Sequence, residues 1–336
     1  MSEPLLRVQG LQVEFKLPRG VLRAVDGASF EVQPGEALGI VGESGSGKTM
    51  TLRALVGLLP RTARITAGTV EIDGVDMTGA GKERRRELRG RTVSMIFQEP
   101  MTALNPVMRV GRQIAESPIV RLGLSRRAAH ARALELMRLV GISDPTRRAE
   151  AYPHELSGGM RQRVMIAIAL SADPKLILCD EPTTALDVTI QDQILKLLGT
   201  LQRELGVSLV FVSHDLAVIA QTCSRVAVMY AGQVVETGTV EAVFREPRHP
   251  YTLGLLRSVP DFDVVRERLA SIPGSPPDLA SLPAGCRFHP RCPFVQADCR
   301  SGAIPLIELG GDRATRCTYH ERCAEDVRLE PVIAGV

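Results

Sequence analysis

Tryptophan is absent from this chain of 336 residues, and aromatic residues make up only 4% of it. A surface that stacks on nucleic-acid bases needs aromatic side chains, so their scarcity argues against such a surface. The 41 basic and 38 acidic residues leave a formal net charge of +3, which indicates no particular polyanionic partner. We therefore expect no nucleic-acid partner.

Long apolar runs are also missing. The start, Met-Ser-Glu-Pro, has neither the basic region nor the apolar segment of a secretory signal, and no run approaches the roughly 20 residues that cross a bilayer. These absences predict a soluble, cytosolic protein. Five of the seven cysteines fall between Cys286 and Cys323. In a reducing compartment such a cluster suggests metal binding rather than disulfides.

A glycine-rich segment stands out at 42–49, with the sequence Gly-Glu-Ser-Gly-Ser-Gly-Lys-Thr. It follows an apolar run, 37–41, and precedes a helix-like run, 50–59, which is the order that a phosphate-binding P-loop needs. Lys48 can reach the outer phosphates, and the Thr49 hydroxyl can bind Mg²⁺. The sequence therefore predicts a site for a nucleoside triphosphate. Its contact residues are Gly42, Ser44, Gly45, Ser46, Gly47, Lys48, Thr49 and Met50.

Strand-like and helix-like segments alternate from about residue 172 onward, which predicts a parallel sheet with helices on both faces. After Phe244 prolines punctuate the chain and mark a boundary. We expect a large α/β domain over 1–246 and a small, loop-rich extension over 247–336.

Two carboxylates follow the apolar run 176–179. Asp180 can hold the Mg²⁺ shell, and Glu181 can orient and deprotonate an attacking water. Gln98 and His214 also end predicted strands, where Gln98 could contact Mg²⁺ or the lytic water and His214 the γ-phosphate. Taken singly, a glutamine or a histidine at such a position is more often a packed or surface residue than a catalytic one.

The segment Ser157-Gly158-Gly159 opens a predicted helix that continues with Met160 and Arg161. Its free N–H groups and hydroxyl form a second site for a phosphate. One γ-phosphate cannot occupy two distant sites in one chain. A head-to-tail dimer, with nucleotide between one P-loop and the partner's Ser-Gly-Gly segment, resolves this conflict.

Together these motifs resemble the ATPase subunits of ABC transporters, in which they occur in the same order. The motifs are the P-loop, Gln98, 156–160, 179–182, 185–187 and His214. The resemblance implies an α/β P-loop core with an antiparallel β subdomain, a helical subdomain near 100–172 and the cysteine-containing extension. It also implies that 157–161 and Asp187 face the ATP of a partner subunit, and that Phe15 stacks on adenine. An inward-facing strand residue is the alternative for Phe15. Met160 replaces the usual glutamine.

A closer resemblance is to dipeptide and oligopeptide importer ATPases, and it is carried by 98–106, 248–252, 273–277 and 285–293. It implies ATP-driven import at the cytoplasmic face of the inner membrane. The partners would be a second ATPase subunit, homologous or identical, two membrane permeases that contact the 100–120 region, and an extracytoplasmic binding protein. Importers of nickel or glutathione, a soluble non-transport ABC ATPase and a metal-dependent regulator are the alternatives.

The cysteine spacing Cys286-x5-Cys292-x6-Cys299-x17-Cys317 lacks the close pairs typical of zinc sites. It fits a [4Fe–4S] cluster better, although it is not the ferredoxin pattern. Some importer ATPases of this type carry such a cluster in the extension. We therefore expect an iron–sulfur cluster on these four cysteines, with free thiols in a reduced tail as the alternative.

Overall fold

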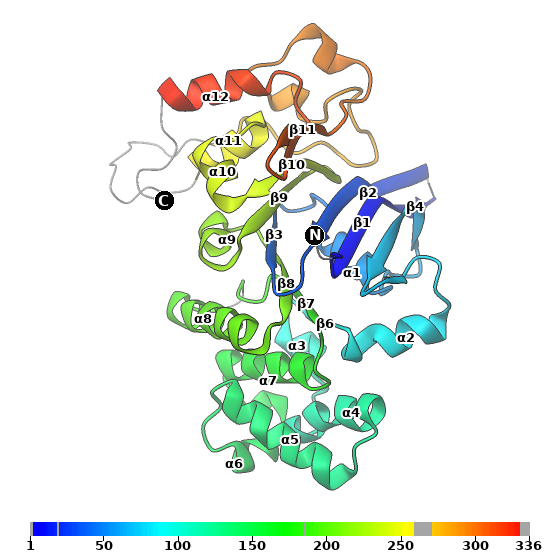
Figure 1. The fold of residues 1–336 in the computed structure, drawn as a ribbon, viewed down its shortest axis with the longest axis vertical. Coiled ribbons are helices and arrows are strands. Elements are labelled where there is room, and N and C mark those ends of the chain that lie inside the picture. Colours follow the sequence, from blue (N-terminus) through cyan, green and yellow to red (C-terminus); the bar gives the residue numbers. More distant parts are fainter. Residues whose placement is uncertain (1–2, 19, 185, 259–270, 330–336) are drawn as a thin grey trace. The chain divides into compact units, whose positions relative to one another are not determined.

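The computed structural model describes residues 3–18, 20–184, 186–258 and 271–329, and Figure 1 shows its fold. The chain divides into two compact units. The first unit comprises 1–6, 32–37 and 71–212. The second unit comprises 7–31, 38–70 and 213–336.

The first unit contains three parallel strands in the order β8, β7, β6, and Val93 of β6 pairs with Leu176 of β7. All five residues of β7 and all six of β8 are buried, as expected for strands covered on both faces. Its strands are β5 (Val75–Asp76), β6 (Val93–Ile96), β7 (Leu176–Asp180) and β8 (Ser208–Ser213).

Helices form the rest of the first unit. Those between residues 100 and 170 pack on one another and correspond to the expected helical subdomain (Figure 1). Ser125 caps α5 as its sequence position predicts, because its side chain accepts a hydrogen bond from the Ala128 N–H. The helices are α2 (Lys82–Arg91), α3 (Pro100–Ala103), α4 (Val110–Leu122), α5 (Arg126–Leu139), α6 (Pro145–Ala149), η1 (Pro153–Glu155), α7 (Gly158–Leu170) and α8 (Val188–Leu205).

Two sheets organise the second unit. One has the order β2, β1, β4, and the other has the order β11, β12, β10, β9, β3. In the latter, β3 runs parallel to β9, whereas β10, β11 and β12 join in antiparallel fashion. The strands are β1 (Leu6–Leu17), β2 (Gly20–Val32), β3 (Ala37–Val41), β4 (Ala63–Ile72), β9 (Arg225–Tyr230), β10 (Gln233–Thr239), β11 (Ile307–Gly310) and β12 (Arg313–Thr315).

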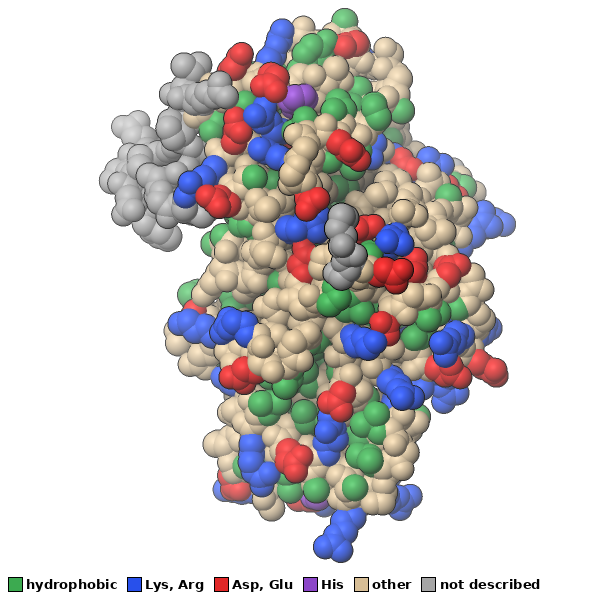
Figure 2. Space-filling model, viewed as in Figure 1, with side chains coloured by type: hydrophobic (Ala, Val, Ile, Leu, Met, Phe, Trp, Pro, Cys, Tyr) green, Lys and Arg blue, Asp and Glu red, His purple; other side chains and the backbone are tan. Residues whose placement is uncertain are grey.

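Short helices complete the second unit: α1 (Lys48–Leu55), α9 (Leu216–Thr222), α10 (Val240–Arg245), α11 (Pro250–Arg257), η2 (His289–Arg291), η3 (Ala297–Arg300) and α12 (His320–Leu329). The mixed α/β fold with an antiparallel sheet and a helical subdomain is confirmed. Within the described part of the chain, no helix combines the length and the apolar character that crossing a bilayer requires. On the face shown in Figure 2, basic and acidic side chains are interspersed.

Glu236 fastens the extension to β10. Its side chain is fully buried, and its two carboxylate oxygens accept hydrogen bonds from the backbone N–H groups of Arg248 at 2.7 Å and His249 at 3.0 Å. Arg313 of β12 lies 3.4 Å from the same carboxylate. Burial raises the pKa of Glu236 to about 7, and it lowers the pKa of His249 to about 3.

Replacing Glu236 with Gln should therefore change how stability depends on pH. The folded-state pKa of Glu236 lies above its ordinary value of 4.5, so this residue lowers stability progressively as pH rises from about 4.5 to about 7. His249 acts in the opposite direction and is common to both proteins. The free energy of unfolding of wild type minus that of Glu236→Gln should fall by about 3 kcal/mol over this interval. Urea unfolding at several pH values measures the difference, and parallel pH curves would contradict the expectation.

Candidate functional site

The P-loop lies in the second unit, between β3 and α1. All five residues of β3 are buried, so the strand delivers the loop from the interior. Gly42 and Gly47 have φ values of 153° and 104°. A Cβ atom at Gly42 would lie 2.1 Å from the carbonyl oxygen of Met229, and one at Gly47 would lie 2.4 Å from that of Ala24. Only glycine fits these two positions, so the packing of the loop fixes its curvature.

Polar groups of this loop suit an anion. Lys48 is buried, and its Nζ donates hydrogen bonds to the carbonyl oxygens of Gly42 at 2.7 Å and Glu43 at 3.0 Å. The buried Ser46 hydroxyl has no hydrogen-bond partner among the described residues. Helix α1 begins at Lys48 without a side-chain cap. A buried ammonium, an unsatisfied hydroxyl and a helix N-terminus together fit a phosphate group.

In the first unit, Asp180 and Glu181 follow one another at the end of β7. Asp180 is 2% exposed. Glu181 adopts a φ of 46°, which is uncommon for a residue with a side chain. Its carboxylate oxygen Oε2 accepts hydrogen bonds from Gln98 Nε2 at 3.2 Å and from Thr184 Oγ1 at 2.9 Å. The structure thus brings Gln98 and Glu181 together and adds Thr184, which the sequence analysis did not select although it lies three residues after Glu181.

The Ser-Gly-Gly segment opens α7 in the first unit. Ser157 is exposed and caps the helix, with its Oγ 3.3 Å from the N–H of Met160. Gly159 packs so tightly that a Cβ atom would lie 2.8 Å from a methyl group of Ile190 in α8. Arg161 Nε donates to the carbonyl oxygen of Pro153 at 2.8 Å, which turns the guanidinium back toward η1. The N-termini of α7 and α8 therefore lie side by side.

Asp187, the N-cap of α8, is exposed. Of the other residues selected from sequence, Phe15 is partly buried on β1, and His214 is exposed just after β8. Both belong to the second unit, as do the P-loop and Met50. Gln98, 157–161, Asp180, Glu181 and Asp187 belong to the first unit. Ala185 lies outside the described residues.

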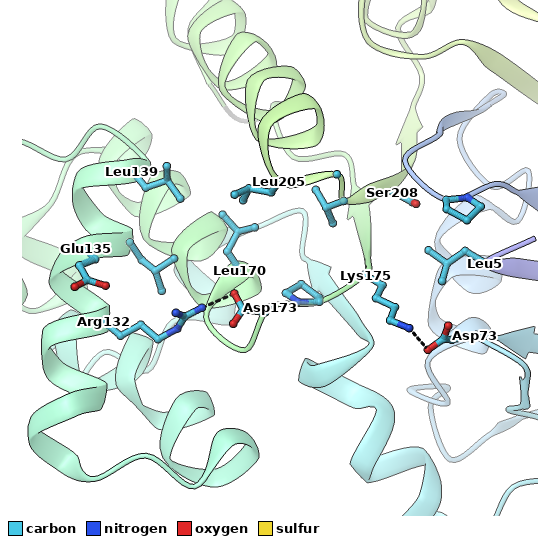
Figure 3. Close-up of a pocket in the computed structure, with 15 residues that line it drawn as sticks. Leu5, Asp73, Arg132, Glu135, Leu139, Leu170, Asp173, Lys175, Leu205 and Ser208 are labelled. Atoms are coloured by element: carbon cyan, nitrogen blue, oxygen red, sulfur yellow. Dashed lines mark hydrogen bonds and ion pairs between the residues drawn. The ribbon is translucent and has the colours of Figure 1, made fainter.

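A groove of about 790 Å³ in the first unit is not lined by any of these residues. Figure 3 shows two ion pairs in it, Arg132–Asp173 at 2.5 Å and Lys175–Asp73 at 2.6 Å, with leucine side chains nearby. Each cation already has a carboxylate partner, so the groove offers little to a phosphate. Chemistry, rather than size, therefore identifies the nucleotide site.

The predicted iron–sulfur cluster is wrong. Cys286, Cys292, Cys299 and Cys317 do line one cavity, but its volume is about 20 Å³, which is close to the space of a single water molecule. Within 3–18, 20–184, 186–258 and 271–329, no group of three or more His, Cys, Asp or Glu residues is placed to hold a metal ion. Burial raises the pKa of Cys292 to about 11 and that of Cys317 to about 12, which disfavours the thiolates that such a cluster needs.

The sequence analysis also missed a set of contacts to the P-loop. Tyr251 and Arg291, both in the extension, hydrogen-bond to Glu43. They lie in segments that resemble the importer extension, but no local pattern joins them to Glu43, because up to 248 positions separate them in sequence.

Comparisons with known proteins agree with these motifs. Residues 25–184 match the ABC transporter family, and residues 235–299 match the oligopeptide/dipeptide transporter C-terminal region. The dipeptide transport ATP-binding protein DppD of Escherichia coli is 48% identical over 94% of this chain and 96% of its own length. DppD of Haemophilus influenzae is 47% identical over 93% and 94% of the two chains.

A solved structure shares the fold. The ATP-binding cassette MJ0796, in a dimeric post-hydrolysis state bound to ADP and phosphate, has a TM-score of 0.64 and 28% identity. The similarity covers 70% of this chain and 98% of that one. With near full-length relatives and matches to both families, the chain belongs to the ATP-binding proteins of ABC transporters, in the oligopeptide/dipeptide transporter branch.

Proposed function

We propose that this chain binds and hydrolyses ATP to energise an importer of dipeptides or oligopeptides. The observation that carries the proposal is that its similarity to dipeptide transport ATP-binding proteins extends over 94% of the chain and includes the extension. The polar groups around the P-loop and the hydrogen-bonded Gln98–Glu181 pair supply the chemistry that this function needs. We assign the ATPase to residues 1–246 and the importer-type extension to 247–336.

Each selected residue has a role in this proposal. Lys48 neutralises phosphate charge, and the P-loop backbone with Ser44, Ser46 and Thr49 surrounds the phosphates. Glu181, held by Gln98 and Thr184, orients and deprotonates the attacking water. His214 contacts the γ-phosphate, and Phe15 stacks on adenine.

Mg²⁺ fits the donor set of this chain, because Thr49, Gln98 and Asp180 offer the hydroxyl, amide and carboxylate oxygens that a hard cation prefers. When bound, the ion neutralises charge on the β- and γ-phosphates. The buried position of Asp180 at the end of β7 limits the directions in which its carboxylate can point.

The second half of each ATP site comes from a partner ATPase subunit. The exposed Ser157 and Gly158 at the N-terminus of α7, with Gly159, Met160, Arg161 and the nearby Asp187, suit contact with a nucleotide held by another molecule. The dimeric state of the MJ0796 cassette supports this assembly. The partner is a homologous subunit or a second copy of this chain.

Two membrane permeases and an extracytoplasmic binding protein complete the importer, and this chain acts at the cytoplasmic face of the inner membrane. The 100–120 region offers a surface for the permease. Met101, in α3, is 57% exposed, and Val107, just before α4, is 83% exposed. Apolar side chains so open to solvent favour a protein contact.

Glu181→Gln should bind ATP normally and hydrolyse it at least about 100-fold more slowly, because the amide keeps the shape of the side chain but cannot accept a proton. ATP binding and phosphate release, measured on the full chain, test this expectation. Glu135→Gln, on the exposed face of α5, is the matched control and should retain both properties. Wild-type hydrolysis by Glu181→Gln would remove Glu181 from the role of base.

Val107→Asp should lower peptide uptake by about tenfold or more in cells that depend on this chain, while the ATPase activity of the isolated protein stays near wild type. The reason is that a charge at an apolar docking surface must be desolvated when the permease binds. Val21→Asp replaces a valine of β2 that is 55% exposed and serves as the control. Equal uptake by the two variants would argue against a permease contact at 100–120.

A further inference from the structure

Glu43, the second residue of the P-loop, forms hydrogen bonds through its backbone N–H, its carbonyl oxygen and its carboxylate. Its backbone N–H donates a hydrogen bond to the Tyr251 hydroxyl at 2.7 Å. Its carbonyl oxygen accepts one from Lys48 Nζ at 3.0 Å. Its carboxylate receives two from Arg291, at 2.7 Å from Nη1 and 3.0 Å from Nη2. Glu43 therefore has little freedom to change its conformation.

Arg291 is itself fixed. It is 6% exposed, and its Nε donates to the carbonyl oxygen of Pro273 at 2.8 Å. Its guanidinium carbon lies 5.8 Å from the ring centre of Tyr230 and 5.9 Å from that of Phe288. These two rings and Tyr251 pack against one another, with centroids 4.5 to 5.5 Å apart. A bidentate pair between a buried arginine and a carboxylate in such surroundings is rigid and directional.

A second contact runs from the extension to the same loop. Arg287 donates hydrogen bonds to the carboxylate of Asp26 and to the carbonyl oxygen of Ala231. The neighbouring residue, Gly232, donates its N–H to the carbonyl oxygen of Ser46 at 2.9 Å. Extension residues thus reach the P-loop directly at Glu43 and through the turn at 231–232.

We propose that Arg291 and Tyr251 of the extension are positioning residues for the P-loop, and that Arg291 also cancels the negative charge of Glu43 beside the triphosphate. The inference rests on the proposed function in that the P-loop binds ATP. A loop that is held in shape before ATP arrives does not have to be ordered on binding, which favours affinity. An unpaired Glu43 carboxylate would repel a polyanion near it.

Arg291→Gln should raise the Kd and KM for ATP by roughly tenfold, with kcat changed by less than about twofold, because the guanidinium acts on binding rather than on the reacting atoms. Glu43→Gln removes the carboxylate and should have a smaller effect. In the double variant Arg291→Gln/Glu43→Gln, ATP affinity should recover toward that of Glu43→Gln, because the uncompensated charge is gone. High salt should shrink the defect of Arg291→Gln, since salt screens repulsion.

Arg313→Gln is the matched control. Arg313 is also an arginine of the extension that pairs with a glutamate, Glu236, and its side chain is 12% exposed, but neither residue contacts the P-loop through a described hydrogen bond. The Arg313→Gln variant should lose stability without a change in its KM for ATP. Arg291→Lys keeps the charge and should lie between wild type and Arg291→Gln. Tyr251→Phe, which removes only the hydroxyl that accepts from Glu43, should raise KM without a change in salt dependence.

The outcomes separate the two proposals. Wild-type protein that fails to bind ATP would overturn the proposed function. Wild-type protein that binds ATP, with Arg291→Gln and Arg313→Gln equal in KM, would overturn only the positioning role. If Arg291→Gln does not fold, Arg291→Lys, Tyr251→Phe and Glu43→Gln decide the matter, and unchanged KM in all three would overturn the inference.

Discussion

The tight packing of the P-loop against backbone carbonyl groups is the constraint on which the nucleotide site depends. Gly42 and Gly47 leave no room for a Cβ atom, because Met229 and Ala24 present their carbonyl oxygens at those points. The curvature of the loop at these two positions is therefore set by its packing. Lys48 is buried beside the loop, and the fold sets the positions of the polar groups that suit a phosphate.

Local patterns in the sequence were enough to predict much of the fold and the main elements of the site. The glycine spacing at 42–47 determines a loop, the apolar run before Asp180 determines a buried strand, and Ser125 determines the start of a helix. Each of these features depends on residues that are close in sequence. The structure adds that Gln98 and Glu181 lie close together, because they follow the neighbouring parallel strands β6 and β7.

What the sequence could not supply was the surroundings of these elements. The contact between Glu43 and Arg291 joins residues 248 positions apart, and neither residue belongs to a pattern that names the other. For the cysteine cluster, by contrast, the sequence predicted a site that the described residues do not form. Its spacing suggested a metal centre, but the geometry of side chains in three dimensions decides whether thiols can share a ligand, and spacing along a loop does not determine it. The cavity that they line is too small for an iron–sulfur cluster.

The pairing of β3 with β9 has a consequence for biosynthesis. Leu38 and its neighbours leave the ribosome early but pair with Arg225–Val228, which are made much later. The contacts of Glu43 with Tyr251 and Arg291 come later still. During translation the P-loop is therefore made long before the residues that contact it. Contacts of such large sequence separation also form slowly. A chain that stops before the extension keeps the packing of the loop on Ala24 and Met229 but lacks its contacts with Tyr251 and Arg291, so a prematurely terminated product carries a phosphate-binding motif that is held only in part.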